Sequence, residues 1–271
     1  MTTRKMVLID TSKCTGCKAC SVACKEWNQL PAEKTQLVMS YQSQKDFTPK
    51  TWTYVTFTEK YENNKMNWLM RKAQCFHCAD PACVKACSSN AISKTESGYS
   101  VIDQNKCIGC GYCEANCPFG VPKVDQVKKK SFKCEGCIDR VENNLKPACV
   151  KTCQPGALEF GEREALLTKA KKRLAEVQKT HPKAMLYGLN EMGGTTYIYL
   201  LLDRPEVYGL PANPQIPASL FLWKDVIRPV GSVAFGGAAA AVVVGVLANV
   251  MRGAYRSKEE GETGHRKGGE S

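Results

Sequence analysis

The sequence predicts an α+β protein that ends in one transmembrane helix, and two observations lead to this fold class. All sixteen cysteines fall into four groups of four, and short apolar strands and helices alternate with these groups. One uncharged stretch near the C-terminus is long enough to cross a bilayer. We therefore expect a globular part organised around its cysteines and one membrane anchor.

The four cysteine groups share a spacing, because each begins with C-x2-C and ends with C-x3-C. The groups are Cys14, Cys17, Cys20 and Cys24; Cys75, Cys78, Cys83 and Cys87; Cys107, Cys110, Cys113 and Cys117; and Cys134, Cys137, Cys149 and Cys153. With the short spacing, three thiolates of one tight loop hold one cubane, and the fourth cysteine reaches the neighbouring cluster. Four groups predict four [4Fe–4S] clusters in two ferredoxin-like pairs, and a protein that moves electrons.

Other uses of cysteine explain less of the pattern. A disulfide framework suits a short secreted chain, whereas this chain has 271 residues and C-x2-C pairs throughout. Structural zinc could use four sets of four thiolates, but a third cysteine after only two residues and the pair Cys117-Pro118 are not zinc features. A membrane-tethered structural zinc protein remains the alternative from another class.

Charge and the remaining motifs indicate no second function. The net charge of +12 permits an acidic protein, an anionic membrane or nucleic acid as partner. We expect no nucleic-acid partner, because the chain has no recognition-helix signature and no basic strand interleaved with aromatic residues. His77 lies inside the second cysteine group, where the thiolate count is already complete. No nucleotide-binding or metal-hydrolase motif occurs, so we expect no catalytic residue in this chain.

Short strands are expected around the cysteine groups. Residues 6–9 form an apolar strand that leads into the first group, and residues 18–28 form a helix within it. Alternation over residues 53–57 predicts a strand inside a cysteine-free insertion. Strands at residues 99–103 and 157–160 complete an internal repeat of strand, cysteine loop and helix.

An amphipathic helix is expected over residues 162–179, after the last cysteine. Leu166, Ala170, Leu174 and Val177 fall on one face of it. A stripe of this width normally packs on the core of its own domain.

The predicted transmembrane helix begins at Val230 and ends at Met251. These residues carry no charge, and at about 1.5 Å per residue they span the roughly 30 Å of a hydrocarbon core. Gly237, Ala241 and Gly245 recur every fourth residue and form a face suited to close helix packing. We expect this helix to anchor the chain in the lipid bilayer.

The motifs resemble those of a known family. Four cysteine motifs are similar to beta subunits of molybdopterin oxidoreductases: CTGCKACSVACKEWN, CFHCADPACVKAC, CIGCGYCEANCPFGVP and KCEGCIDRVENNLKPACVKTC. Five further segments are more specific: TWTYVTFTE, MNWLMRK, GGTTYIYLL, YGLPANPQIP and LWKDVIRPVG. With them the chain resembles, nearly end to end, the iron–sulfur (beta) subunit of membrane-bound respiratory formate dehydrogenases of the nitrate-inducible type. Ser88 and Gln154 stand where that family often has a proline, which is not a ligand.

The resemblance implies a non-catalytic electron-transfer subunit in a heterotrimer. A molybdopterin or tungstopterin alpha subunit would oxidise formate, and a cytochrome b gamma subunit would reduce quinone. The alternative within oxidoreductases is the beta subunit of another respiratory complex, such as a hydrogenase or a nitrate or sulfur-compound reductase.

The resemblance also implies crossed ligand sets, in which the last cysteine of each group binds a cluster of its partner group. The sets are Cys14, Cys17, Cys20 and Cys153 for cluster 1; Cys75, Cys78, Cys83 and Cys117 for cluster 2; Cys107, Cys110, Cys113 and Cys87 for cluster 3; and Cys134, Cys137, Cys149 and Cys24 for cluster 4.

Four parts of the chain follow from these expectations. Residues 1–160 form the four-cluster domain, with groups one and four in one lobe and groups two and three in the other. Residues 161–228 form a helix, strand and linker region that packs on this domain. Residues 229–252 form the anchor, and residues 253–271 a polar, flexible tail.

The family further implies a position at the inner membrane. The N-terminus has no twin-arginine motif and no apolar leader, so we expect export together with a catalytic partner that carries the signal. The cluster domain would lie outside, on the periplasmic face, and the tail from Arg252 would be cytoplasmic. A small excess of basic residues after the span agrees with this orientation.

Overall fold

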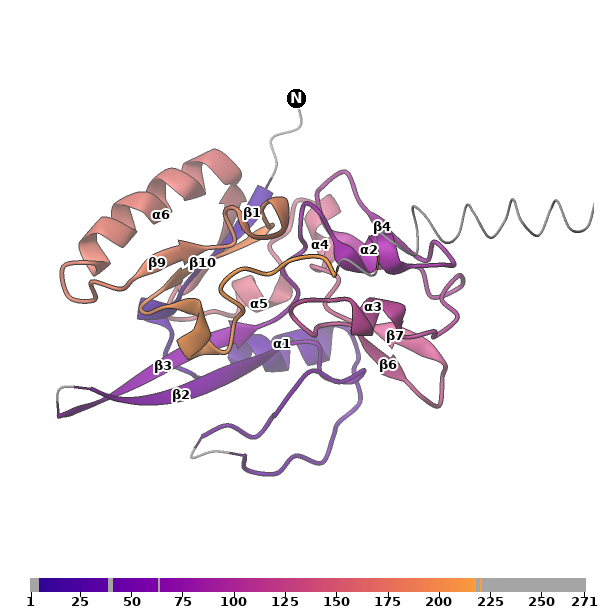
Figure 1. The fold of residues 1–271 in the computed structure, drawn as a ribbon, viewed down its shortest axis with the longest axis horizontal. Coiled ribbons are helices and arrows are strands. Elements are labelled where there is room, and N and C mark those ends of the chain that lie inside the picture. Colours follow the sequence, from indigo (N-terminus) through magenta and orange to yellow (C-terminus); the bar gives the residue numbers. More distant parts are fainter. Residues whose placement is uncertain (1–4, 39–40, 63, 218–219, 221–271) are drawn as a thin grey trace, which may run out of the picture. The chain divides into compact units, whose positions relative to one another are not determined.

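The computed structural model describes residues 5–38, 41–62, 64–217 and 220, and the chain divides into two compact units, Met1–Ile216 and Pro217–Ser271. The predicted transmembrane helix and the polar tail lie outside the described residues. Within the described ranges, no helix has the length and apolar character needed to cross a membrane. The first unit, drawn in Figure 1, carries all sixteen cysteines.

A four-stranded sheet forms the base of the first unit, with strand order β8-β1-β10-β9. At its centre, β1 (Lys5–Asp10) pairs in parallel with β10 (Tyr197–Leu201) and antiparallel with β8 (Leu158–Glu162). The edge strand β9 (Met185–Tyr187) pairs antiparallel with β10. Because β1 and β10 are buried on both faces, they consist of nearly continuous apolar and aromatic residues.

The two faces of this sheet pack against different layers. Helix α6 (Arg163–Val177) covers one face, where Leu166 and Ala170 contact Met6 and Leu8 of β1. This confirms that the amphipathic helix packs on its own core. The alternate residues of β1 belong to the core on the opposite face, together with Cys149, and Figure 1 shows the short helices α1 and α5 on that side.

The helices that follow the cysteine loops pack in crossed pairs. Helix α1 (Ala19–Trp27) of the first group contacts α5 (Ala148–Lys151) of the fourth group. Helix α2 (Ala82–Ala86) of the second group contacts α3 (Tyr112–Ala115) of the third group. Elements far apart in the sequence are thereby brought together.

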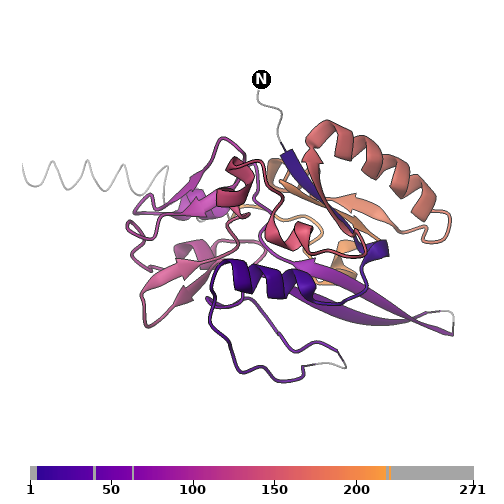
Figure 2. The same cartoon turned by 180° about the vertical axis from the view of Figure 1, so that it is seen from behind.

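Three hairpins complete the unit, which is seen from behind in Figure 2. The longest joins β2 (Tyr54–Glu62) to β3 (Lys65–Ala73). The others join β4 (Ile92–Lys94) to β5 (Ser100–Ile102) and β6 (Lys123–Asp125) to β7 (Lys130–Phe132). The remaining elements are α4 (Ile138–Glu142) and the 3-10 turns η1 (Thr11–Lys13), η2 (Glu191–Gly193) and η3 (Pro205–Tyr208).

The predicted elements of the cysteine-bearing region are confirmed within a few residues. Strands expected at residues 6–9, 99–103 and 157–160 correspond to β1, β5 and β8, and the helix at 18–28 corresponds to α1. The strand expected at 53–57 is the start of the longer β2.

Candidate metal-cluster site

The four cysteine loops share one backbone conformation. The second residue after the first cysteine of each group has a positive φ, at 67° for Gly16, 68° for Gly109, 71° for Gly136 and 49° for His77. Glycine adopts this left-handed conformation without steric cost, whereas a residue with a Cβ is strained there. The repeat predicted from spacing is therefore also a repeat of loop geometry, with a histidine in the place of one glycine.

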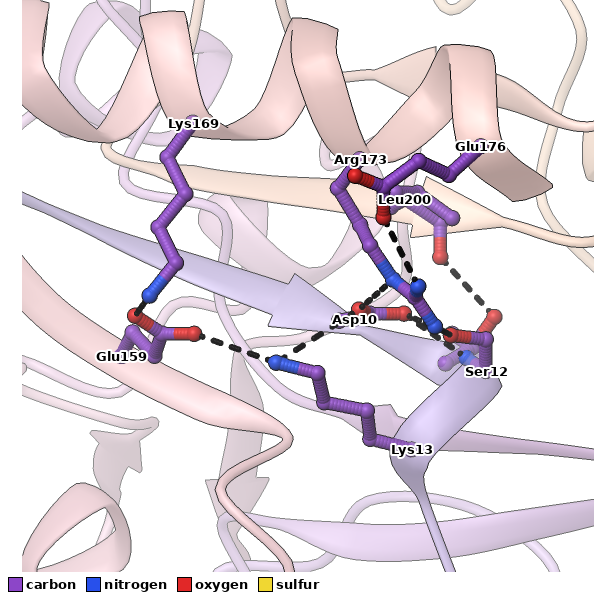
Figure 3. Close-up of polar contacts among 9 residues, drawn as sticks. Asp10, Ser12, Lys13, Glu159, Lys169, Arg173, Glu176 and Leu200 are labelled. Carbon is purple, nitrogen blue, oxygen red and sulfur yellow. Dashed lines mark hydrogen bonds and ion pairs between the residues drawn. The ribbon is translucent and has the colours of Figure 1, made fainter.

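The first loop is held to the sheet and to α6 by polar contacts, shown in Figure 3. Asp10, at the end of β1, accepts hydrogen bonds from the backbone nitrogen of Ser12 at 3.0 Å and from Arg173 Nε at 3.3 Å. Arg173 NH2 also donates to Ser12 Oγ at 3.1 Å. Glu159 pairs with Lys13 and with Lys169 of α6. These contacts fix the approach to Cys14 from two elements at once.

A small cavity lies where the first loop faces the end of the fourth group. Four thiols line it: Cys14, Cys17, Cys20 and Cys153. Lys72 lines the same cavity. The set that the resemblance implies for cluster 1 is thus assembled around one space.

A second small cavity lies between the second and third groups. Four thiols line it: Cys75, Cys78, Cys83 and Cys117. Lys133 and Ser100 complete the wall, and Phe119 closes part of it. This is the set implied for cluster 2.

The cysteines implied for cluster 4 are also neighbours. Burial raises the pKa of the Cys137 thiol to about 12, and the nearby charges of Cys149 and Cys24 add to the effect. Burial likewise raises the pKa of Cys134, with further contributions from Cys24 and Cys137. Thiols that influence one another in this way lie close together in a medium of low dielectric constant.

The cysteines implied for cluster 3 surround a small core. Cys107 and Cys113 are buried there, with the half-buried Cys87 packed against them. The pKa of Cys113 is raised, mainly by burial. A hydrogen bond with the Ser131 hydroxyl opposes this shift, and the nearby Cys110 and Cys107 add to it. Cys110 itself is exposed.

Several sulfurs receive hydrogen bonds from the backbone. The donors are Gly136 N to Cys134 Sγ at 3.4 Å, His77 N to Cys75 Sγ at 3.5 Å, Ser131 N to Cys107 Sγ at 3.3 Å and Ala91 N to Cys87 Sγ at 3.2 Å. Such bonds favour the thiolate, which is the form that binds metal.

Buried polar atoms near the cavities lack partners among the described residues. They include Ser100 Oγ, Tyr99 OH, Gln74 Nε2 and His77 Nε2. Buried polar groups are nearly always hydrogen-bonded, so such atoms indicate a partner beyond the protein itself. Bridging sulfides of an iron–sulfur cluster accept such bonds, so the thiol-lined cavities and these donors fit that group. In the described part of the chain, no three His, Cys, Asp or Glu side chains form a group that could hold a single metal ion.

Two features of the site were not predicted from the sequence. Lys72 and Lys133 are almost completely buried, at 2% and 1% exposure. Only their positions close to cysteine groups in the sequence could have indicated this burial. Lysine is mostly exposed in proteins, and no sequence pattern distinguishes a buried lysine from an exposed one. His77, inside the second cysteine group, is buried as well, and its Nδ1 accepts a hydrogen bond from Ser100 N at 3.0 Å.

Comparisons with known families identify the cysteine-rich region and the C-terminal segment separately. Residues 66–163 match the family described as 4Fe-4S dicluster domain, and residues 5–26 match 4Fe-4S binding domain. Residues 216–260 match the family described as formate dehydrogenase N, transmembrane. The chain therefore carries 4Fe-4S binding domains.

Curated relatives cover most of the chain. The formate dehydrogenase iron-sulfur subunit of Haemophilus influenzae is 44% identical over 89% of this chain and 79% of its own length. The nitrate-inducible formate dehydrogenase iron-sulfur subunit of Escherichia coli K12 is 42% identical over 84% of this chain and 79% of its own length. A subunit of the anaerobic dimethyl sulfoxide reductase of the same organism is 38% identical, over 62% of this chain and 78% of its own length.

Proposed function

Because the chain belongs to the family of formate dehydrogenase iron–sulfur subunits, we propose that it carries electrons within a formate dehydrogenase complex. A molybdopterin or tungstopterin alpha subunit supplies them by oxidising formate, and a membrane-bound cytochrome b gamma subunit passes them to quinone. The observation that carries this proposal is the high identity along most of the chain, together with two cavities that are each lined by four thiols. The chain itself performs no bond chemistry.

Four [4Fe–4S] clusters are held in the crossed sets named from the resemblance. Three observations support these sets: the two cavities lined by four thiols each, the packing of α1 on α5, and the packing of α2 on α3. When bound, the clusters supply one-electron carriers. The residues of the chain provide the thiolates, hydrogen bonds to sulfur and an interior that excludes water.

Thiols of different sets lie near one another, and these neighbours give the sets an order. Cys20 is close to Cys149, which joins the sets of clusters 1 and 4. Cys134 is close to Cys75, which joins the sets of clusters 4 and 2, and Cys83 is close to Cys113, which joins clusters 2 and 3. The order supports a path from one end of the first unit to the other.

The chain is anchored in the inner membrane by one helix over residues 230–251, with the cluster domain on the periplasmic face. The match of residues 216–260 to a transmembrane family supports membrane association. Protease added to intact spheroplasts should digest the cluster domain. Protection in spheroplasts, with digestion only in inverted vesicles, would place the domain in the cytoplasm.

Purification with the partner subunits tests the function. The complex should contain a pterin-bearing large subunit, and formate should bleach the broad visible absorption of the iron–sulfur clusters. A large subunit that oxidises hydrogen or reduces nitrate would indicate the other respiratory complexes. A colourless preparation that contains zinc would refute the clusters.

The crossed ligand sets have their own test. Substitution of Cys24 by alanine should damage the cluster bound by Cys134, Cys137 and Cys149, because the last cysteine of a group reaches across to the neighbouring cluster. Substitution of Cys20 is the matched control, and it should damage the cluster of its own loop. Electron paramagnetic resonance distinguishes the two losses. The same spectrum from the Cys24 and Cys20 variants would refute the crossed ligand sets.

A further inference from the structure

Two lysines lie in the interior and form no salt bridge, although the carboxyl group of Glu135 lies near Lys133. Lys72 and Lys133 are 2% and 1% exposed, and neither makes a salt bridge with any described residue. Burial of an unpaired ammonium group is costly, so fully buried lysines are rare. An interior that contains two of them must supply negative charge by another means.

Within the protein, only some of the N–H donors of each ammonium group have an acceptor. Lys72 Nζ donates to Gln74 Oε1. Lys133 Nζ donates to the carbonyl oxygens of Ser100 and, at 3.1 Å, of Cys134. An ammonium group has three N–H donors, so each lysine keeps at least one for another acceptor.

Each lysine lies among the thiols of two different ligand sets. Lys72 lines the cavity of the Cys14 set, and the Cys149 and Cys134 thiols are also close to it. Lys133 lines the cavity of the Cys75 set and is close to Cys134 as well.

We propose that Lys72 and Lys133 are buried cations that raise the reduction potentials of the clusters bound in these two cavities. The inference rests on the proposed function, since it requires bound clusters. A cluster that gains one electron gains one negative charge, and a nearby fixed positive charge stabilises this reduced form. In a buried site the charge is little screened by water. The two lysines thereby make the interior clusters easier to reduce.

Lys130 offers a matched comparison in the same protein. Its Nζ donates to the carbonyl oxygen of Cys107 at 2.6 Å, so it also lies beside a cysteine ligand. Lys130 is only partly buried, and solvent screens its charge. A fixed cation should therefore matter more at Lys72 and Lys133 than at Lys130.

Redox titration of the purified complex, followed by electron paramagnetic resonance, tests the proposal. Lys72→Met and Lys133→Met should each make one cluster at least tenfold harder to reduce, which is about 59 mV for one electron. The two variants should shift different signals, and Lys130→Met should shift its signal much less. Lys72→Arg and Lys133→Arg, which keep the charge, should leave the potentials near those of the unmodified protein.

Unchanged potentials in the methionine variants, or an equal shift in Lys130→Met, would overturn the proposal. If the methionine variants do not assemble, Lys72→Gln and Lys133→Gln keep a hydrogen-bond donor and remove the charge. Failure of these variants as well would show a role in assembly in place of tuning. Absence of cluster signals from the unmodified complex would instead refute the proposed function.

Discussion

The two cysteine-rich regions of the first unit differ in what fills their interiors. The sheet lobe contains the first and fourth cysteine groups together with β1, β8, β9, β10 and α6. Its main core has one cysteine among fifteen buried residues, two of which, Phe76 and Tyr99, come from the other region. The hairpin lobe, residues 75–132, lies to the right in Figure 1 and contains only short elements. Cysteines are three of the six buried residues in its local core. The hairpin lobe therefore depends on its metal clusters for an interior, whereas the sheet lobe also has an apolar core.

Removal of iron should produce the largest difference between the two lobes. After chelation, backbone amides of β4, β5, β6 and β7 should lose protection from hydrogen exchange, because metal binding and folding are coupled in regions with little apolar core. Amides of β1 and β10 should retain most of their protection. Hydrogen–deuterium exchange with mass spectrometry measures both. Equal loss of exchange protection in both lobes would contradict the proposed difference between their interiors.

A glycine lies at one of the close contacts between the lobes. A Cβ on Gly136 would lie 2.1 Å from the ring of Tyr99, and its φ of +71° is unfavourable for alanine. Gly136→Ala should therefore lower the free energy of unfolding by about 2–5 kcal/mol, from backbone strain and overpacking together. Gly156→Ala is the matched control, because Gly156 has a φ of +65° but no atom within 4 Å of a Cβ. Its loss should be limited to about 1 kcal/mol of strain. Denaturant unfolding measures the free energy of unfolding of both variants. Equal losses of stability would refute the steric contribution of Tyr99.

The ion pairs between α6 and β1 should matter only for the sheet lobe. Arg173→Met removes two donors from the buried Asp10 and from Ser12, and should cost about 1–3 kcal/mol. Exchange should increase at β1 and α6 and remain unchanged in the hairpin lobe. Lys172→Met, at an exposed neighbouring position, should change stability by less than about 0.5 kcal/mol. An increase of hydrogen exchange in the hairpin lobe would contradict the expectation that the effect is limited to β1 and α6.

The smallest expected effect concerns pH. Burial alone would raise the pKa of the Asp203 carboxyl, but the hydrogen bond from Lys60, at 2.5 Å, outweighs burial and the pKa is lowered. The ion pair therefore stabilises the fold above the ordinary carboxyl pKa of about 3.9, and this contribution is lost as the pH falls through the lower pKa of the folded state. Asp203→Asn should cost about 0.2–1 kcal/mol at neutral pH and nothing at the acidic end. A cost independent of pH, measured by unfolding at several pH values, would refute the ion pair as its cause.

Regular patterns made part of this fold predictable. The apolar run of β1 and the stripe on α6 have the periods of a buried strand and of an amphipathic helix. In contrast, a strand was expected within residues 161–228 but was not placed, although the residues of β10 are as buried as those of β1. Its aromatic residues alternate with aliphatic ones on two buried faces, so they show no polar alternation from which a strand could be recognised.

The ligand groups were predictable because thiolate spacing is a local property of the chain. Their surroundings were not, because these depend on contacts between distant segments. Lys72 and Lys133 become interior cations only after the loops close around them. His77 replaces a glycine in the repeated loop, and its burial follows from packing against Tyr99 and Tyr197.

The parallel pairing of β1 with β10 has a consequence for biosynthesis. Thr11 Oγ1, just after β1, donates to the carbonyl oxygen of Leu200, 189 residues away. A nascent chain therefore cannot complete its central sheet until β10 has left the ribosome, and pairing over such a separation is slow. Until then one edge of an apolar strand stays open to other chains. The first cysteine loop, which follows β1 directly, therefore reaches its final support only after nearly the whole described chain has been synthesised.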